Sequence, residues 1–211
     1  MQALVVRPEN DRAHRAAVEL GILQLTEMAL KNASDSASKA ALQKTLEETI
    51  QHGLSAVMIG KNDYQNWLSL AQLYQQLAGV GVQGAYQQAH DAYVSAMSKD
   101  PTNPYIQFKL SQLEATQGHY DEALDFVNKA IVLKPDLAVA YYLQSQLYSA
   151  KQKYPEAITA AKNAVSLVPQ DPLGWYNLGV ILYANRNFRD AAASFSQAAS
   201  IQTDYSNALF M

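Results

Sequence analysis

Residues 79–84, with the sequence Gly-Val-Gly-Val-Gln-Gly, match the G-x-G-x-x-G spacing that cradles the phosphates of a bound dinucleotide. That fingerprint needs a β-strand directly before the glycines, so that the turn meets the next helix inside a βαβ unit. Residues 70–77 carry a helical pattern instead. We therefore interpret the glycines as an insertion between two helices, with a phosphate site as the alternative, and we expect no cofactor.

Four histidines, His14, His52, His90 and His119, are candidate metal ligands that lie far apart in the sequence. A metal site needs several ligands that converge on one point. None of the histidines belongs to an H-E-x-x-H sequence, which would place two ligands on one helix face. The four side chains are therefore expected to face solvent, and no metal site is predicted.

Two pairs of adjacent carboxylates, Glu47-Glu48 and Asp121-Glu122, are candidates for general acid–base chemistry. Adjacent residues of a helix point in different directions, so neither pair forms a facing acid–base couple by itself. Asp121 is better explained by the favourable interaction of a carboxylate with the N-terminal dipole of a helix. With no nucleophile elbow and no phosphate loop, no catalytic residue is predicted, and we predict that the chain is not an enzyme.

Composition narrows the classes of partner. The 211 residues have a formal net charge of −3 and no dense block of Lys or Arg, which argues against nucleic acid as the main partner. The absence of cysteine excludes disulfides and thiolate metal sites. No run of about 18 apolar residues occurs, so no membrane span is predicted in this segment. The compartment stays open between the cytoplasm and the extracytoplasmic part of a membrane protein.

Three proline and alanine series share one period. The prolines and alanines that recur every 34 residues are Pro101, Pro135 and Pro169; Ala89, Ala123, Ala157 and Ala191; and Ala96, Ala130, Ala164 and Ala198. A 34-residue period is typical of a helix–turn–helix array, in which each unit packs on its neighbours. The elements that position any functional side chain are therefore expected to be stacked pairs of helices.

The clearest repeats span residues 104–137, 138–171 and 172–205. The middle repeat has an aromatic residue at its fourth position (Tyr141), a small residue at its eighth (Ser145), alanines at the twentieth and twenty-seventh, and Pro169 at the thirty-second. These residues resemble the tetratricopeptide repeat (TPR), although Gln107 and Gln144 stand where that family has apolar residues. The resemblance implies an all-α fold, a right-handed α-α superhelix (solenoid) of helical hairpins.

The remaining boundaries follow from the same register. Residues 63–103 are expected to form a fourth repeat, with six extra residues in a loop insertion near 79–84. Residues 1–62 are interpreted as a divergent hairpin, with helices over 11–31 and 37–59, preceded by the tail of a truncated repeat. Residues 206–211 resemble the start of a truncated helix. The whole chain is expected to be one continuous solenoid domain.

In the resembling family, the second, fifth, ninth, twelfth and thirteenth positions of each first helix line an inner groove. Carried over to this sequence, the resemblance implies a lining of aromatic, amide and aliphatic side chains. The predicted partner-binding residues are Gln72, Tyr105, Phe108, Gln112, Tyr142, Gln146, Tyr176, Val180 and Tyr183. The alternative is that the aromatic residues only pack against the neighbouring first helix.

These observations lead to a non-catalytic scaffold that binds an extended peptide or a partner helix in the groove. A second hypothesis rests on residues 84–104, which are similar to the soluble repeat tails of bacterial O-antigen-polymerase-like membrane proteins. The chain would then be an appendage that positions a glycan, a lipid-linked acceptor or a partner. A third possibility is self-association through the truncated ends, where an apolar repeat face has no cap.

Overall fold

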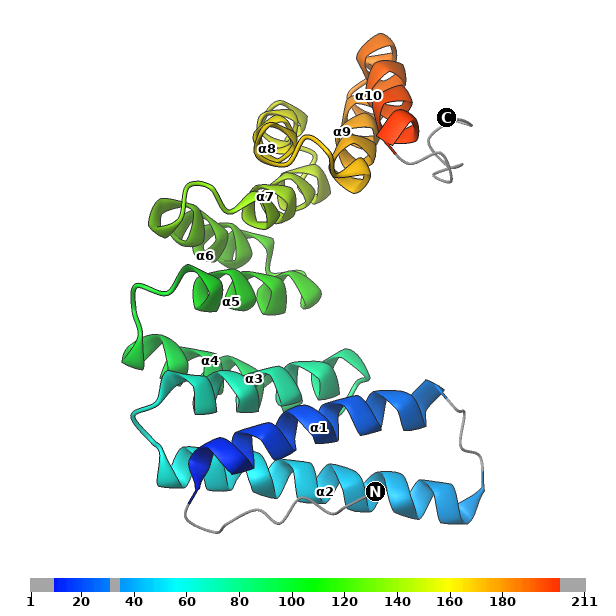
Figure 1. Ribbon diagram of the computed structural model, residues 1–211. Coiled ribbons are helices and arrows are strands. Elements are labelled where there is room, and N and C mark those ends of the chain that lie inside the picture. The colour runs from blue at the N-terminus through cyan, green and yellow to red at the C-terminus, as the bar shows by residue number, and fades with distance from the viewer. Residues whose placement is uncertain (1–9, 31–34, 202–211) are drawn as a thin grey trace. The chain divides into compact units, whose positions relative to one another are not determined.

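The computed structural model describes residues 10–30 and 35–201, and every regular element in these ranges is an α-helix (Figure 1). The helices are α1 (Asp11–Leu30), α2 (Ser36–Ile59), α3 (Tyr64–Gly79), α4 (Ala85–Lys99), α5 (Pro104–Thr116), α6 (Tyr120–Leu133), α7 (Ala138–Ala150), α8 (Tyr154–Leu167), α9 (Pro172–Ala184) and α10 (Phe188–Ile201). The helices predicted over residues 11–31 and 37–59 are confirmed where they are described, as α1 and α2. The predicted repeat ends at 1–8 and 206–211 lie outside the described residues.

The chain divides into two compact units, Met1–Thr102 (unit 1) and Asn103–Met211 (unit 2). In unit 1, α1 pairs with α2 and α3 pairs with α4, and both α1 and α2 contact α3. In unit 2, the hairpins α5–α6, α7–α8 and α9–α10 follow one another, and each second helix contacts the first helix of the next hairpin. The predicted fold class, an all-α solenoid of helical hairpins, is confirmed. One continuous solenoid across both units stays a prediction.

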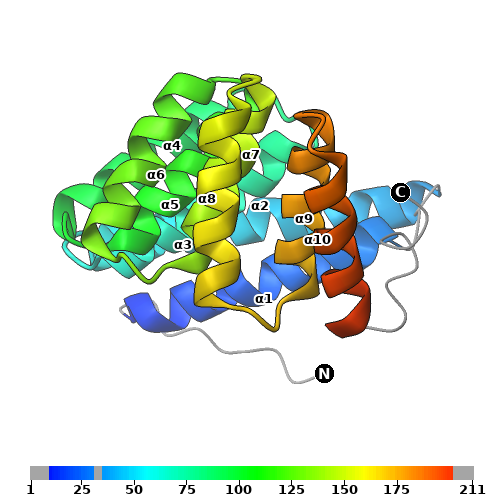
Figure 2. The same ribbon diagram turned by 90° about the horizontal axis from the view of Figure 1, so that it is seen from above.

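Successive hairpins of unit 2 are rotated relative to one another. Figure 1 shows α5 and α6 lying across the view, whereas α9 and α10 run steeply. Seen from above, α8 lies in front of α7 and α10 in front of α9 (Figure 2). The first helices are also neighbours, since α5 contacts α7 and α7 contacts α9. Equivalent positions of these three helices therefore follow one another along one side of unit 2.

The starts of α5 and α9 are capped as the sequence predicts. The Asn103 side chain accepts a hydrogen bond from the Tyr105 backbone N–H at 3.0 Å, and Pro104 opens α5. Asp171 caps α9 in the same way. A proline at the first helical position has no N–H to leave unpaired, so it suits a helix that begins with a side-chain cap.

The helices α3, α5, α7 and α9, each the first helix of its hairpin, end in the same backbone turn. The second residue beyond the end of each helix has a left-handed conformation; these residues are Gly81, Gly118, Gln152 and Arg186, with φ of 82°, 77°, 57° and 63°. The next N–H then bonds to a carbonyl five residues earlier, for example His119 to Glu114 at 3.1 Å. This is the Schellman motif, which usually takes glycine. The turn therefore recurs in every one of these hairpins, although glycine occupies it in only two.

Some of the extra residues predicted for 63–103 lengthen the first helix, and the others lie in the loop after it. Helix α3 has 16 residues, against 13 in α5, and the turn after it carries two glycines with positive φ, Gly81 and Gly84. The glycine motif therefore follows a helix and precedes a helix. The strand that a dinucleotide-binding turn requires is absent from this described stretch.

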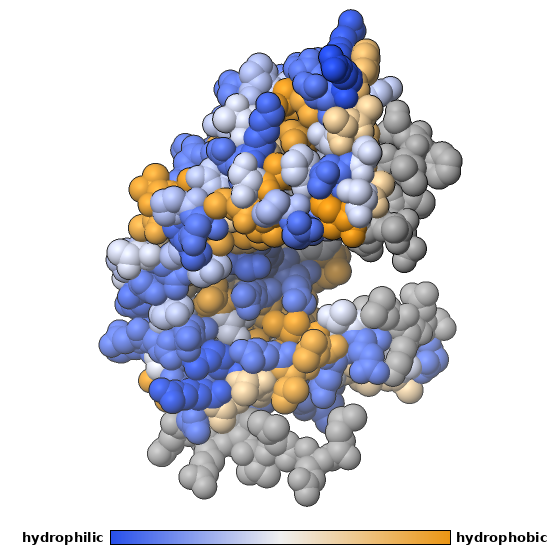
Figure 3. Space-filling view, turned by 45° about the horizontal axis from the view of Figure 1, so that its top comes forward, coloured by the Kyte–Doolittle hydropathy of each residue, from blue (hydrophilic) through white to orange (hydrophobic). Residues whose placement is uncertain are grey.

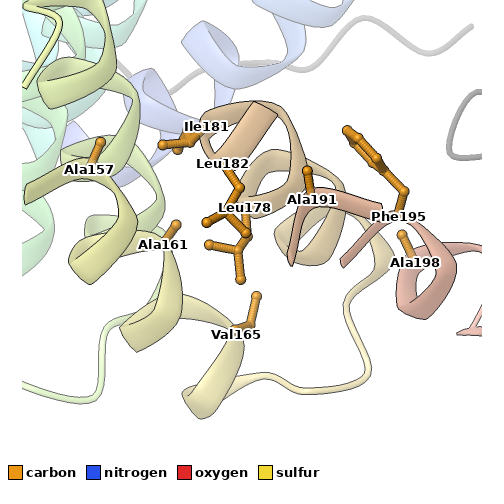
Figure 4. Close-up of a cluster of buried hydrophobic side chains, with 9 residues drawn as sticks. All are labelled: Ala157, Ala161, Val165, Leu178, Ile181, Leu182, Ala191, Phe195 and Ala198. Atoms are coloured by element: carbon orange, nitrogen blue, oxygen red, sulfur yellow. The ribbon is translucent and has the colours of Figure 1, made fainter. Parts of the chain in front are cut away.

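Small residues allow the helices of unit 2 to approach closely. Ala123, Ala130 and Ala157 are completely buried, as the 34-residue period predicts. Figure 4 shows the cluster between the last helices, formed by Ala157, Ala161 and Val165 of α8, Leu178, Ile181 and Leu182 of α9, and Ala191, Phe195 and Ala198 of α10. A Cβ atom added to Gly179 would lie 2.6 Å from the Phe195 ring, so the glycine makes room for that ring.

Unit 1 is held together by a buried polar group, the Asn66 side chain, which is completely inaccessible. Its amide nitrogen donates to the Ala56 and Gly60 carbonyls, both at 3.1 Å, and to Asp11 at 3.0 Å. Its oxygen accepts a 2.8 Å hydrogen bond from Arg15. The hydrogen bond from Asn66 is also the main reason that the pKa of Asp11 is lowered. One amide therefore joins the start of α1, the end of α2 and the start of α3.

Candidate partner-binding surface

Eight of the nine predicted partner-binding residues lie on α5, α7 and α9. Tyr105 and Tyr183 are each 51% exposed, and Val180 is 38% exposed. Gln146 is also exposed. We use the name α5–α7–α9 face for the set Tyr105, Phe108, Gln112, Tyr142, Gln146, Tyr176, Val180 and Tyr183. The other four members are half-buried, so solvent reaches every part of the set.

The opposite faces of the same helices form the core. Ile106 and Leu110 are completely buried, Leu147 is 3% exposed and Ile181 is 1% exposed. A helix with one buried stripe presents its remaining residues to solvent or to a partner. Because α5, α7 and α9 are neighbours in space, the exposed residues of the three helices lie along one side of unit 2.

Some aromatic residues of the face also pack within unit 2. The Tyr176 ring lies 5.5 Å from the buried Phe195 ring, and Phe108 packs against the cluster around Ala123. The Tyr183 ring meets the exposed Phe188 ring edge to face at 5.3 Å. Tyr176 and Phe108, which are half-buried, therefore also pack within unit 2, and Tyr176 does so against α10 of its own hairpin rather than against a neighbouring first helix. Tyr183 remains half exposed.

The first helices of unit 2 carry very little charge. Within α5, α7 and α9 the charged residues are Lys109 and Glu114, both in α5. Glu114 is 3% exposed and lies 2.8 Å from His119 Nδ1 across the hairpin turn. Lys109 Nζ donates to Gln112 Oε1 at 3.1 Å and lies 6.0 Å from the centre of the Phe108 ring. Lys109 was not among the predicted partner-binding residues. It occupies the sixth position of its repeat, and the resemblance implied only the second, fifth, ninth, twelfth and thirteenth positions.

Gln72, the ninth predicted residue, belongs to unit 1. It lines a cavity of about 430 Å³ between α1 and α3, together with Arg15, Glu19, Gln65, Leu68 and Ser69. Arg15 is held there by Asp63 at 2.9 Å. Gln72 is therefore not a member of the α5–α7–α9 face, and its role in partner binding stays a prediction.

A second cavity, of about 370 Å³, lies between α7 and α8 and was not predicted from the sequence. Its walls are Gln144, Tyr148, Pro155, Glu156, Thr159, Ala160 and Asn163. Gln144, which departs from the apolar pattern of the repeat, donates to Asn128 Oδ1 of α6 at 2.7 Å. The amide is thus paired across two hairpins, which explains a polar residue at that position.

The prediction that the histidines face solvent is wrong for His14. This side chain is 8% exposed, and its Nδ1 lies 2.9 Å from Nδ1 of His52 across the α1–α2 hairpin. Its Nε2 is buried and has no hydrogen-bond partner among the described residues. Burial first, and then the neighbouring His14, lower the pKa of His52. The contact joins residues 38 positions apart, so the spacing of histidines along the sequence did not reveal it.

Two further findings concern metals and membranes. Within the described ranges, no group of three or more His, Cys, Asp or Glu side chains is arranged to hold a metal ion. Over residues 10–30 and 35–201, no helix combines the length and the apolar character needed to cross a membrane.

On the face visible in Figure 3, hydrophobic surface occurs in separate patches bordered by hydrophilic surface.

Comparisons with known proteins agree with the repeat register. Two sequence models, both described as tetratricopeptide repeat, match residues 83–147 and 142–206. No curated protein matches the chain significantly.

Several solved structures have a similar fold. The crystal structure of MamA has a TM-score of 0.66 and 18% identity, with 80% of this chain and 89% of MamA covered. YrrB, a TPR protein with an unusual peptide-binding site, has a TM-score of 0.63 and 17% identity over 88% of this chain and 95% of YrrB. PilF of Pseudomonas aeruginosa has a TM-score of 0.69 and 17% identity over 94% of this chain and 81% of PilF. At these identities the likeness is one of fold.

Proposed function

Since this chain belongs to the tetratricopeptide repeat family, we propose that it is a non-catalytic scaffold for protein interactions. The bound segment, an extended peptide or a partner helix, lies on the α5–α7–α9 face. One observation carries the proposal. Three neighbouring helices bury one face in the core, and on the opposite face they present aromatic, aliphatic and amide side chains to solvent.

The residue types of the face suit a peptide. Tyr and Phe offer a large contact area and have few rotatable bonds, so little side-chain entropy is lost on binding. Gln112 and Gln146 each carry both a donor and an acceptor, which can pair with the N–H and C=O groups of a peptide backbone. The combination provides apolar contact from the rings and backbone recognition from the amides.

The comparison with YrrB supports a peptide ligand at the level of fold. YrrB is described as having an unusual peptide-binding site. A fold alone does not assign a function, so the proposal for this chain depends on its own exposed residues. The alternative of an appendage to a membrane glycan polymerase or ligase, and self-association through the chain ends, both stay predictions.

A selection from a random library of short displayed peptides tests the proposal. The full chain is the bait, and enriched peptides are then measured against Tyr105→Ala combined with Tyr183→Ala. Both tyrosines are half exposed, so their truncation removes contact area at a small cost to the core. We expect the double variant to lose the selected peptides and to keep the helical circular dichroism of the parent.

The matched control replaces two exposed residues of α6, Tyr120→Ala combined with Val132→Ala. This control is expected to bind the selected peptides like the parent. Equal binding by the parent and by the Tyr105/Tyr183 variant contradicts the assignment of the face. Failure to enrich any peptide contradicts the peptide as ligand.

A further inference from the structure

We infer that the bound segment is apolar and uncharged where it crosses α7 and α9 and carries an acidic side chain that pairs with Lys109 at α5. The inference rests on the proposed function and adds the chemistry and the orientation of the ligand.

The first step is the absence of charge from two of the three helices. The sequences of α7 and α9 contain no Asp, Glu, Lys, Arg or His. A ligand charge placed on these helices would be removed from water without a charged partner, which is unfavourable. The second helices differ, since α6 alone contains Asp121, Glu122, Asp125 and Lys129. The lack of charge is thus a property of α7 and α9 and not of unit 2 as a whole.

The second step is the apolar surface at α9. Leu173 is 44% exposed, Val180 38% and Tyr183 51%. The ring of Phe188, 58% exposed, extends this surface beyond the end of α9 by its contact with Tyr183. Exposed aliphatic and aromatic groups that lie together bind another apolar group in preference to water. An aromatic or large aliphatic ligand residue is therefore expected at α9.

The third step is the state of Lys109. Its ammonium group is held between an amide, Gln112, and the face of an aromatic ring, Phe108. No described carboxylate lies within ion-pair distance of it. Its side chain is half-buried, so water solvates the charge only in part. An acidic ligand side chain would supply the missing counterion, and the half-buried position would weaken screening by salt.

The order of the helices gives the ligand a direction. Helices α5, α7 and α9 are successive neighbours. Packed helices have axes about 8–10 Å apart, so α5 and α9 are separated by roughly 16–20 Å. An extended chain covers about 3.3 Å per residue, and the acidic and apolar residues are therefore about five or six residues apart.

A peptide array tests this inference with the full chain. The array holds peptides of Ala, Ser and Gln that carry one Asp and one Phe in every combination of positions, in both orders. We expect the strongest binding at a separation of about five or six residues, and in only one of the two orders. Replacing Asp by Asn in the best peptide is expected to weaken binding by about fivefold in fluorescence anisotropy, as for a single ion pair near the surface.

Charge reversal identifies the lysine. Lys109→Glu is expected to reverse the preference, so that a peptide with Lys in place of Asp binds better. Lys162→Glu, the same charge change on α8, is the control and is expected to keep the preference for Asp. A Lys109→Glu variant that still prefers Asp overturns the inference.

The outcomes separate the inference from the proposed function. If Phe-containing peptides bind equally well with Asp and with Asn, the role of Lys109 is wrong and the apolar binding face stands. If no peptide of the array binds and none is enriched from the random library, the proposed function fails together with the inference.

Discussion

Gly179→Ala is the substitution whose effect the structure defines most sharply. The added methyl group would lie 2.6 Å from Phe195 Cε1 and 2.7 Å from Cδ1. Both distances are shorter than atoms tolerate, and the ring cannot move freely because Phe195 is 2% exposed and packs against Tyr176. The substitution therefore forces the ring, or the α9–α10 hairpin, to shift.

The magnitude follows from two opposing terms. Overpacking of a core costs about 1–3 kcal/mol. Alanine is favoured over glycine inside a helix by about 1 kcal/mol. The net effect expected for Gly179→Ala is a loss of about 1 kcal/mol in the free energy of unfolding, measured by urea denaturation. Gly79→Ala is the control, since nothing lies within 4 Å of the added atom there, and it is expected to be neutral or slightly stabilising.

The other repeats of unit 2 suggest how to relieve the clash. The positions equivalent to Gly179 hold Ser111 and Ser145, while those equivalent to Phe195 hold Val127 and Ala161. A larger residue on the first helix thus accompanies a smaller one on the second. Phe195→Val by itself is expected to destabilise unit 2, by less than the roughly 3–5 kcal/mol of a truncation to alanine.

The decisive measurement is a double-mutant cycle between the two positions. In the Phe195→Val background the clash is gone, so Gly179→Ala is expected to stabilise by up to about 1 kcal/mol. The sign of its effect is therefore reversed, which corresponds to a coupling of about 2 kcal/mol. If Gly179→Ala has the same effect in both backgrounds, the reasoning about this contact is refuted.

Three further predictions concern the rest of the chain. Asn66→Ala removes all four hydrogen bonds of a completely buried amide, and we expect it to destabilise the protein by about 2–4 kcal/mol in urea unfolding; a loss below about 1 kcal/mol would show that water replaces the amide. Gln152→Gly and Arg186→Gly remove the strain of a left-handed side-chain-bearing residue, and each is expected to stabilise by up to about 1 kcal/mol, whereas a loss in both would contradict the assigned backbone conformation. The pKa of His52 is lower in the folded state than its unfolded value of 6.5. The stability that neutral His52 contributes is therefore complete above pH 6.5 and is lost as the pH falls from 6.5 towards the folded-state pKa. His52→Gln, which can still pair with His14, should therefore lose less stability than the parent between neutral and mildly acidic pH, and equal losses would count against the buried histidine contact.

The repeat architecture of this protein was determined by its sequence alone. Alanines such as Ala123 and Ala157 recur at a constant period because two helices approach closely only where a side chain is small, and the structure buries them completely. Caps such as Asn103 were equally predictable, because a cap depends on residues two or three positions apart. The helical register follows from such short-range and periodic signals, whereas the predicted partner-binding residues rest on the resemblance to the tetratricopeptide repeat.

The tertiary structure decided the features that depend on distant parts of the chain. The contact of His14 with His52 joins two helices, and the space for Phe195 depends on a glycine in another helix. The left-handed turn at Gln152 follows from the hairpin and is adopted without glycine. Lys109 reaches Gln112 of the α5–α7–α9 face by the direction of its side chain, which spacing alone did not indicate. Periodicity predicts which residues share a helix face, whereas packing between helices determines which side chains meet.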